Sequence, residues 1–492
     1  MKLKQKKYST LHKKNFFLLK NTVNIGHFFS LSVICILTLP FLLTEGLFMD
    51  GAMYSTIANN FANGEGTFWF PAFSGDVHNP FFEHPPFAFY LEGIFNQILG
   101  GSYFTSRIYG LFTIFSSTIF IHLIWTNSTR AELKKYSWVA ILCWIITPQI
   151  FWGATQNILE NTLSMFCLGS IYFMIKATKV KLTPSIIFSF LGALFTLLAF
   201  LSKGFVGLFP LAFYGILWFT SRNSNNSFSG ISLKKTFTHY LHLIISCLFL
   251  FFVFIYINDD AVESLTTYIN KQVGASIKGE LRNDNRFIVL TRLFSELLPI
   301  IGLIIIGLIF TRKNSIIKNI GNSSFYIHIF VAISASFPLM VSPKQGAFYI
   351  IPSIPYFSLA LCLILIHIIK SQPSKPQINN RKINRFFTYF SSVVIIASIV
   401  LLINNKGSYN RDGNEIKDIK IISAKFPNSS ISLTPELKGN WAHMAYLKRY
   451  GNIDIYRQKP KDIVLASKKH LKLKGYVLSE LKLNNFNLFI KE

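Results

Sequence analysis

The stretch FFEHPPFAFYLEG, residues 81–93, places a glutamate, a histidine and two prolines directly before an aromatic, helix-like run. Pro85 and Pro86 fit the first turn of a helix, where a missing N–H group costs nothing. Glu83 and His84 would then be fixed just ahead of that helix. Upstream, in FMDGAMYSTIANN (48–60), Asp50 follows directly on a long apolar run. Because a charge at membrane depth is costly and usually functional, both patches are candidates for chemistry.

The composition of the chain is that of a polytopic membrane protein. Its 492 residues are 51% hydrophobic and 14% charged, with a mean hydropathy of +0.40. Several apolar runs reach the roughly 17–25 residues that a helix needs to cross a bilayer. The net charge of +27 lies in short clusters between those runs, which is typical of membrane loops and excludes a basic nucleic-acid-binding domain. The five cysteines lie within or beside apolar runs, so no disulfide framework is expected.

The apolar runs predict about eleven membrane spans. Residues 1–24, which carry many lysines and no acid, are expected to be a cytoplasmic N-terminus before an uncleaved anchor. The spans lie within residues 25–403, which we interpret as the transmembrane domain. They cover residues 25–48, 104–125, 137–151, 159–175, 185–201, 205–219, 240–257, 294–310, 325–340, 347–369 and 386–402.

The charge of the loops predicts the orientation. The loops on the side of the N-terminus are basic and almost free of acids, whereas no Lys or Arg occurs between residues 21 and 106. Under the positive-inside rule, residues 49–103 therefore form the first periplasmic loop, and residues 258–293 form the second. Helical spacing of apolar residues in 49–103 predicts helices lying in the membrane interface. That first loop carries Asp50, Glu65, Asp76, Glu83 and Glu92.

Residues 404–492 are polar, and the span count places them outside as a small soluble domain. The stretches IKIISA, SISLTPE, IDIYR and DIVLAS look like strands, and GNWAHMAYLKRY looks like a helix. This pattern favours an α/β or α+β domain. Trp441 and His443 are expected to be packing or surface residues, since nothing in this domain looks catalytic. The predicted fold class is thus an all-α polytopic membrane protein with interfacial helices in its first outside loop and this C-terminal domain.

Four stretches of the sequence resemble known enzymes. They are residues 50–110, ATQNILENTLSMFCL (154–168), LAFLSKGFVGLFP (198–210) and SPKQGAFYIIPSIPYFSLAL (342–361). In this order they are similar to the lipid A aminoarabinose transferases and the protein O-mannosyltransferases. Both are polyprenyl-phosphate-sugar-dependent glycosyltransferases of the membrane-embedded C fold. The predicted orientation places the motif residues of all four stretches at outside ends of spans.

The resemblance implies a sugar transfer from an undecaprenyl phosphate donor to a lipid, glycan or protein hydroxyl at the outer face of the bacterial inner membrane. Direct displacement from a lipid phosphate would invert the anomeric centre. Asp50 is implied as the general base, and Glu83 as the second catalytic carboxylate. Cations are expected to stabilise the leaving phosphate, and further residues to contact the substrates. The phosphate-binding candidates are Lys203, Lys344 and Arg107, and the substrate-binding candidates are His84, Glu160, Tyr54 and Tyr349.

Three positions depart from the family pattern. Gly51 stands where many relatives carry Glu after the Asp, His84 stands where the aminoarabinose transferases have Lys, and Glu160 replaces the usual Asp. The acceptor is therefore expected to differ from lipid A phosphate, and no cofactor is assigned. A divalent metal bound by Glu83 together with Gln272 or Glu280 of the second loop stays open.

A transporter or flippase of lipid-linked intermediates is the alternative of another class. Such a protein is expected to carry ionisable residues near the bilayer midplane and to be built from repeated halves. The sequence has no internal repeat, and no charged residue is central to a predicted span. Within the enzyme class, another lipid-linked donor, or an oligosaccharide polymerase or ligase, also stays open.

Overall fold

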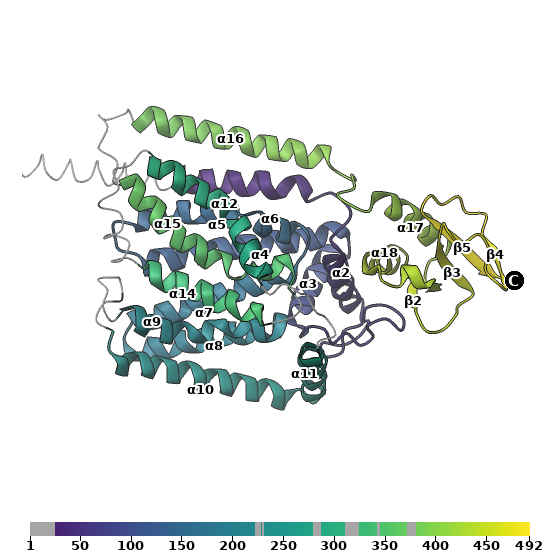
Figure 1. Cartoon of the computed structure of the whole chain (residues 1–492), viewed down its shortest axis with the longest axis horizontal. Coiled ribbons are helices and arrows are strands. Elements are labelled where there is room, and N and C mark those ends of the chain that lie inside the picture. Colours follow the sequence, from purple (N-terminus) through teal and green to yellow (C-terminus); the bar gives the residue numbers. More distant parts are fainter. Residues whose placement is uncertain are drawn as a thin grey trace, which may run out of the picture.

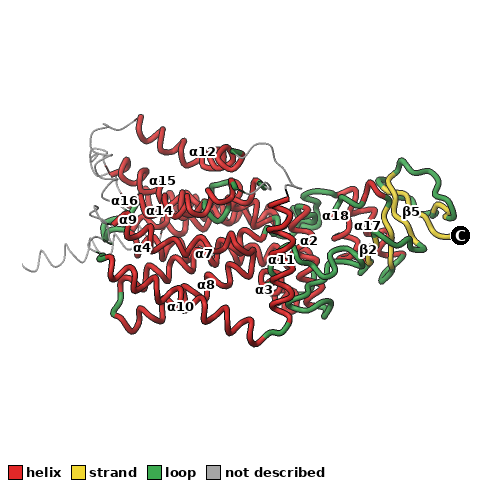
Figure 2. Tube along the Cα trace, turned by 60° about the horizontal axis from the view of Figure 1, so that its bottom comes forward, coloured by secondary structure: helices red, strands yellow, loops and turns green. Residues whose placement is uncertain are grey.

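The structure is a computed structural model, and it describes residues 25–221, 228, 231–278, 287–309, 324–341, 345–370 and 380–492. A bundle of long helices forms one part of the molecule, and a small domain with a β-sheet lies at one end of it (Figure 1). Helices α2 (Met49–Ala62), α3 (Phe87–Leu99) and α11 (Asp260–Lys278) lie at the end of the bundle that faces this domain (Figures 1 and 2).

Each of the eleven predicted spans coincides with a helix or a helix pair. The first is the apolar helix Ile25–Phe41, which closes with the 3-10 turn η1 (Leu39–Phe41). The others are α4 (Tyr103–Ser128), α5 (Ser137–Ile145) with α6 (Pro148–Thr155), α7 (Leu159–Lys179), α8 (Leu182–Lys203), η3 (Gly204–Ala212) with α9 (Phe213–Ser221), α10 (Leu233–Ile257), α12 (Ile288–Ile309), α14 (Phe325–Ser336) with η5 (Phe337–Met340), η6 (Ala347–Ile350) with α15 (Ile354–Lys370), and α16 (Asn380–Asn404). A short 3-10 turn, η2 (Lys134–Tyr136), precedes α5.

The number of membrane crossings stays a prediction. Within the described ranges, five helices are long and apolar enough to cross a membrane, and the bent α5–α6 pair makes six if it is one span. Three further apolar helices are shorter. The segment 182–221 is one of those five helices. Within it, α8 and η3 pack along each other, so the chain reverses its direction at Gly204. Gly204 has φ +76°, and a Cβ atom there would lie 1.8 Å from the Tyr268 hydroxyl of α11.

The predicted span 137–151 is broken by a bend of 70° between α5 and α6. Pro148 begins α6 and prevents the α5 hydrogen-bond ladder from continuing. The Gln149 N–H at the new helix start donates to Glu296 Oε2 over 2.9 Å. Glu296 is buried in the interior of α12, so the expectation that no span carries a central charge was wrong. Its role here is to satisfy a helix end within the bundle.

The C-terminal domain is a mixed sheet with two helices, as predicted in outline. The sheet order is β2 (Asp454–Tyr456), β1 (Ser430–Leu433), β3 (Ile463–Ser467), β5 (Phe486–Lys491), β4 (Tyr476–Leu478). β1 pairs in parallel with β2 and β3, and β5 pairs antiparallel with β3 and β4. The 3-10 turn η7 (Pro435–Leu437) and helix α18 (Trp441–Gly451) follow β1.

One secondary-structure prediction in this domain was wrong. The stretch IKIISA, expected to be a strand, belongs to helix α17 (Gly413–Lys425). Ile416, Ile419 and Ile422 are all fully buried. Their spacing of three residues places them on one face of a helix, and this tertiary packing outweighs the strand preference of β-branched residues.

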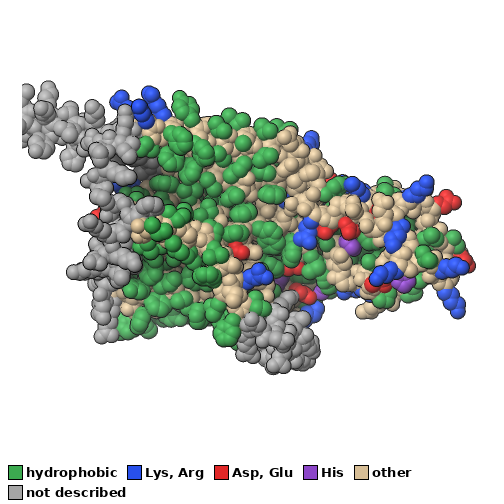
Figure 3. Space-filling view, turned by 45° about the horizontal axis from the view of Figure 1, so that its top comes forward, with side chains coloured by type: hydrophobic (Ala, Val, Ile, Leu, Met, Phe, Trp, Pro, Cys, Tyr) green, Lys and Arg blue, Asp and Glu red, His purple; other side chains and the backbone are tan. Residues whose placement is uncertain are grey.

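The two parts of the molecule differ in the side chains that they expose. Hydrophobic side chains cover the visible face of the bundle, whereas charged side chains gather toward and on the C-terminal domain (Figure 3). Between the two parts there is one continuous core. Met53 and Ile57 of α2 belong to the same buried hydrophobic cluster as Ile416 of α17 and Leu447 of α18. The C-terminal domain is therefore packed onto the first loop rather than tethered beside it.

Candidate active site

Helix α2 presents Asp50 in its first turn. The Phe48 N–H, at the N-cap position, donates to Gln156 Oε1 over 2.7 Å. Gln156 lies at the end of α6, so this bond fixes the start of α2 against the loop that leads into α7. The Asp50 side chain is half-buried. A carboxylate in the first turn is also stabilised by the helix dipole.

The residue after Asp50 is a glycine for a steric reason. A Cβ atom at Gly51 would lie 1.8 Å from the main-chain oxygen of Gln156 and 3.3 Å from that of Asn157. No side chain fits into that space, so the second carboxylate that relatives carry here has no room in this chain. The departure noted in the sequence thus follows from the close approach of α2 to residues 156–157.

Tyr54, one turn after Asp50, connects α2 to the second patch. Its hydroxyl lies 3.1 Å from His84 Nε2, and the two rings contact edge to face. Burial raises the pKa of the Tyr54 phenol well above its usual 10, and nearby negative charge at Asp50, Glu160 and Glu83 adds to the rise. Three carboxylates from three segments of the chain therefore converge around one buried tyrosine.

Glu160 and Lys203 form a buried ion pair between α7 and α8. The Lys203 ammonium also lies 4.9 Å from the ring centroid of Tyr349 and 5.7 Å from that of Phe348. The second Glu160 oxygen, Oε2, is buried and has no hydrogen-bond partner among the described residues. A lysine has three N–H donors and the pair uses one of them, so donors are left for another anion.

Glu83 stands at the edge of this group and is 37% exposed. Its Oε1 lies 3.8 Å from His78 Nε2. Gln272 of α11 contacts the same residue, but its amide donates to the Glu83 main-chain oxygen over 2.9 Å rather than to the carboxylate. The second loop thus reaches the site through a helix that the sequence analysis did not predict.

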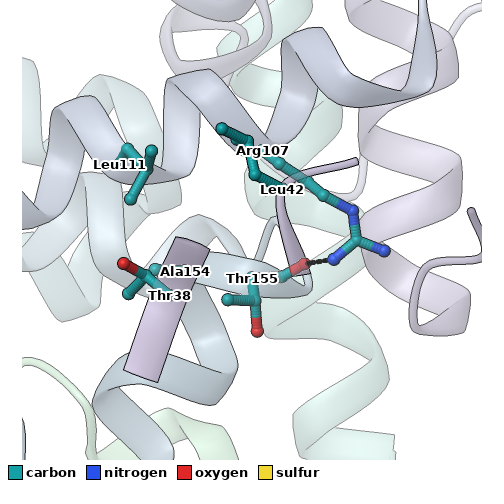
Figure 4. Close-up of a pocket in the computed structure, with 6 residues that line it drawn as sticks. All are labelled: Thr38, Leu42, Arg107, Leu111, Ala154 and Thr155. Atoms are coloured by element: carbon teal, nitrogen blue, oxygen red, sulfur yellow. Dashed lines mark hydrogen bonds between the residues drawn. The ribbon is translucent and has the colours of Figure 1, made fainter. Parts of the chain in front are cut away.

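Arg107 lies in a different environment. Its guanidinium donates to the main-chain oxygens of Thr155 and Gly46, each over 2.6 Å. It borders a cavity of about 10 Å³ at the start of α4, with room for roughly one water (Figure 4). These contacts hold the end of α6 against the segment before α2, and phosphate binding by Arg107 stays a prediction. The cavity is lined by Thr38, Leu42, Arg107, Leu111, Ala154 and Thr155.

Two predicted residues lie outside the described part of the chain. They are Lys344, proposed for phosphate binding, and Glu280, one of the two second-loop partners considered for Glu83. Among the described residues, no three His, Cys, Asp or Glu side chains form a group that could hold a metal ion. Metal dependence stays a prediction, and no chemical step below is routed through a metal.

Comparisons with known proteins bear on the family and the fold of the chain. The family model described as dolichyl-phosphate-mannose-protein mannosyltransferase matches residues 83–257. The fold is similar to that of ArnT from Cupriavidus metallidurans in the apo state, with a TM-score of 0.61, 12% identity, and 94% of this chain and 96% of that chain covered. ArnT bound to undecaprenyl phosphate gives a TM-score of 0.60 at 13% identity, covering 94% and 97%. No curated protein matches the chain.

The resemblance inferred from the sequence is therefore confirmed at the level of fold. The chain is a polytopic membrane protein with the glycosyltransferase C fold. More narrowly, its fold is similar to that of ArnT over nearly its whole length. The matched family region begins at Glu83 and ends with α10, so it contains Glu160 and Lys203 but not Asp50.

The sequence analysis missed a second polar group beside the site. Glu92 and Asn157 are buried and bonded to each other, and Arg449 of α18 lies close to them. Glu92 was noted only as one acid of the first loop. No pattern around Arg449 marks it, since KRY at the end of an amphipathic helix is typical of a solvated surface.

Proposed function

We propose that the chain is a glycosyltransferase that moves a sugar from a polyprenyl phosphate donor to an acceptor hydroxyl at the outer side of the membrane. One observation carries this proposal. Asp50 is a candidate base, and its neighbour Gly51 packs against the main chain of Gln156 and Asn157, in the loop that leads into the buried Glu160–Lys203 ion pair. The undecaprenyl phosphate held by the similarly folded ArnT supports the donor class.

In the proposed reaction, the acceptor hydroxyl oxygen attacks the anomeric carbon while the Asp50 carboxylate takes the hydroxyl proton. The bond between the anomeric carbon and the phosphate oxygen breaks, and polyprenyl phosphate leaves with the bonding electron pair. Attack opposite to the leaving group inverts the anomeric centre. Lys203 stabilises the charge that develops on the phosphate, since its environment is shielded from bulk water. Lys344 remains a second candidate cation.

Glu160 has a supporting role in this scheme. It orients the Lys203 ammonium and supplies its counter-charge, because a buried lysine without one would be costly. Tyr54, one turn after the base, and His84, next to Glu83, contact each other, and we assign both to substrate contact. Glu83, which is partly exposed at the rim, is assigned to orienting the acceptor.

The test is release of polyprenyl phosphate by purified protein in lipid nanodiscs. A panel of polyprenyl-phosphate sugars is supplied with an envelope extract as acceptor. Asp50→Asn is expected to lower turnover about 10²–10⁴-fold, the range for loss of a positioned base. Asp462→Asn, which makes the same change at an exposed carboxylate of the C-terminal domain, is the matched control and should match wild type.

Each outcome is decisive. Release that depends on Asp50 and not on Asp462 supports the transferase, and the active panel member names the sugar. Release that survives Asp50→Asn removes Asp50 as the base. Folded wild-type protein that releases nothing from any donor would contradict the proposed activity, and the fold would then serve another lipid-linked substrate or transport.

A further inference from the structure

Arg449 of α18 reaches from the C-terminal domain into the membrane-proximal part of the molecule. Its Nη1 donates to the hydroxyls of Ser55 on α2 and Ser106 on α4, the latter over 3.2 Å. Its Nη2 donates to the main-chain oxygen of Ser102. A single side chain of the C-terminal domain thus joins the helix of the candidate base to the start of α4.

The chain of contacts continues inward from Ser106. The Glu92 carboxylate of α3 lies near Ser106, which opposes the rise that burial causes in the pKa of that carboxyl. Both Glu92 oxygens accept from Asn157 Nδ2, each over 3.0 Å. Asn157 belongs to the loop against which Gly51 packs, next to Asp50, and this loop leads directly into Glu160. The path therefore ends at the loop that joins the surroundings of Asp50 to Glu160, the partner of Lys203.

The electrostatics of this group support a fixed arrangement. Burial lowers the pKa of the Arg449 guanidinium, and the charge of Glu92 opposes that change. Burial likewise raises the pKa of the Glu92 carboxyl, and the Asn157 bond opposes the rise. The Glu92 carboxylate is buried and the Arg449 guanidinium is half-buried, and each is hydrogen-bonded to neutral groups. A displacement of either side chain would cost these bonds, so the pair favours one geometry.

Two neighbouring residues of α18, Ala445 and Tyr446, also form hydrogen bonds with α2 and with the residue before it. The Tyr446 hydroxyl lies 3.0 Å from both the N–H and the carbonyl oxygen of Leu47, just before α2 begins. The Thr56 hydroxyl of α2 donates to the Ala445 main-chain oxygen over 3.3 Å. The start and the middle of α2 are therefore both bonded to a single helix of the C-terminal domain, within one shared hydrophobic core.

We propose that Arg449 is a positioning residue. Through Ser106, Glu92 and Asn157 it sets the place of Asp50 relative to the Glu160–Lys203 pair, and the C-terminal domain is thereby an integral part of the active site. This inference rests on the proposed function for its meaning in catalysis, although the positioning itself is a structural statement. Because the cation that binds the donor phosphate is on α8, loss of Arg449 should lower turnover and leave donor binding nearly unchanged.

The experiment compares Arg449→Gln, Glu92→Gln, the double variant and Lys469→Gln. Lys469 is an exposed cation of the same domain, so its variant controls for the change of charge. Each single variant at the path is expected to lower kcat about 10²-fold, the scale of an ångström misplacement, with KM for the donor within about twofold. The double variant should be no slower than the slower single one, since the two residues act through one path.

A second readout does not depend on activity. Hydrogen exchange of residues 49–62 and 156–162 should accelerate in Arg449→Gln and Glu92→Gln and stay unchanged in Lys469→Gln. Arg449→Lys retains the charge with fewer hydrogen-bond donors, and it replaces Arg449→Gln as the test variant if Arg449→Gln does not fold. We expect the Arg449→Lys protein to unfold at the wild-type temperature and to lose turnover.

Failure of this inference can be told from failure of the proposed function. If wild type releases no polyprenyl phosphate, the function fails, and the exchange data alone decide whether Arg449 positions α2. Unchanged exchange in both segments would overturn the inference, whatever the activity. Multiplicative losses in the double variant, or a raised donor KM with normal kcat, would also overturn it.

Discussion

At the scale of single residues, Gly51 offers a direct test of how the candidate base is placed. A methyl group there would meet the Gln156 main-chain oxygen at 1.8 Å, and neither backbone can move without shifting Asp50. Gly51→Ala is therefore expected to lower the free energy of unfolding by about 1–3 kcal/mol, as overpacking does. Thermal unfolding in detergent measures the effect, with polyprenyl phosphate release beside it.

The matched control for that change is Gly215→Ala in α9. A Cβ atom at Gly215 would have no neighbour within 4 Å, so the variant should be neutral or stabilise the helix by about 0.5–1 kcal/mol. Equal unfolding temperatures for the two variants would mean that α2 does not approach residues 156–157 as closely as the structure shows.

The residues found from the sequence and those missed differ in a physical way. Asp50 follows directly on a long apolar run, so the local sequence marked it, whereas Glu160 and Lys203 were marked by the family resemblance of their stretches. Arg449 becomes important only when α18 packs on α2, a contact between residues almost 400 positions apart. Arg107 was marked by its charge alone, and its bonds to two main-chain oxygens could not be foreseen from sequence.

At the scale of the elements, α6 depends on a partner from another helix. Its N-terminus lies within the bundle after a 70° bend, and Glu296 of α12 accepts from the Gln149 N–H there. Glu296→Leu should cost about 1–3 kcal/mol, because it leaves a buried donor unsatisfied. Glu296→Gln retains an acceptor oxygen and loses only the charge. Its loss of stability should therefore be clearly smaller, about 0.3–1 kcal/mol, the contribution of a charge at a helix end. Thermal unfolding of both variants in one lipid composition checks this difference.

Helices that consist of a long apolar run could be predicted from the sequence. Elements whose secondary structure depends on packing against other segments could not. Helices α4 and α7 begin within one residue of the predicted spans and end three and four residues after them. By contrast, α17 carries a strand-like sequence, and α11 is an amphipathic helix in a polar loop whose partners, Gly204 and the Glu83 main chain, come from other segments. Neither could be assigned without knowing what it packs against.

At the scale of the whole molecule, the two ends of the bundle differ in kind. Contacts at one end join the predicted cytoplasmic loops, as in the ion pair of Lys370 with Glu132 at 3.5 Å. The candidate site and the C-terminal domain lie together at the other end (Figure 1). Whatever the number of crossings, the fold thus requires that the candidate site and the C-terminal domain share one side of the membrane.

The charge of the loops predicts that this side is the periplasm, and labelling tests it. A cysteine in place of Lys469, exposed on the C-terminal domain, should react with an impermeant thiol reagent in intact bacterial cells. A cysteine in place of Lys134, exposed in the loop before α5, should react only after the membrane is opened. The five native cysteines are buried or half-buried, and the wild-type protein gives the background. The reverse pattern would place the site in the cytoplasm, where an outward-facing lipid-linked sugar could not reach Asp50.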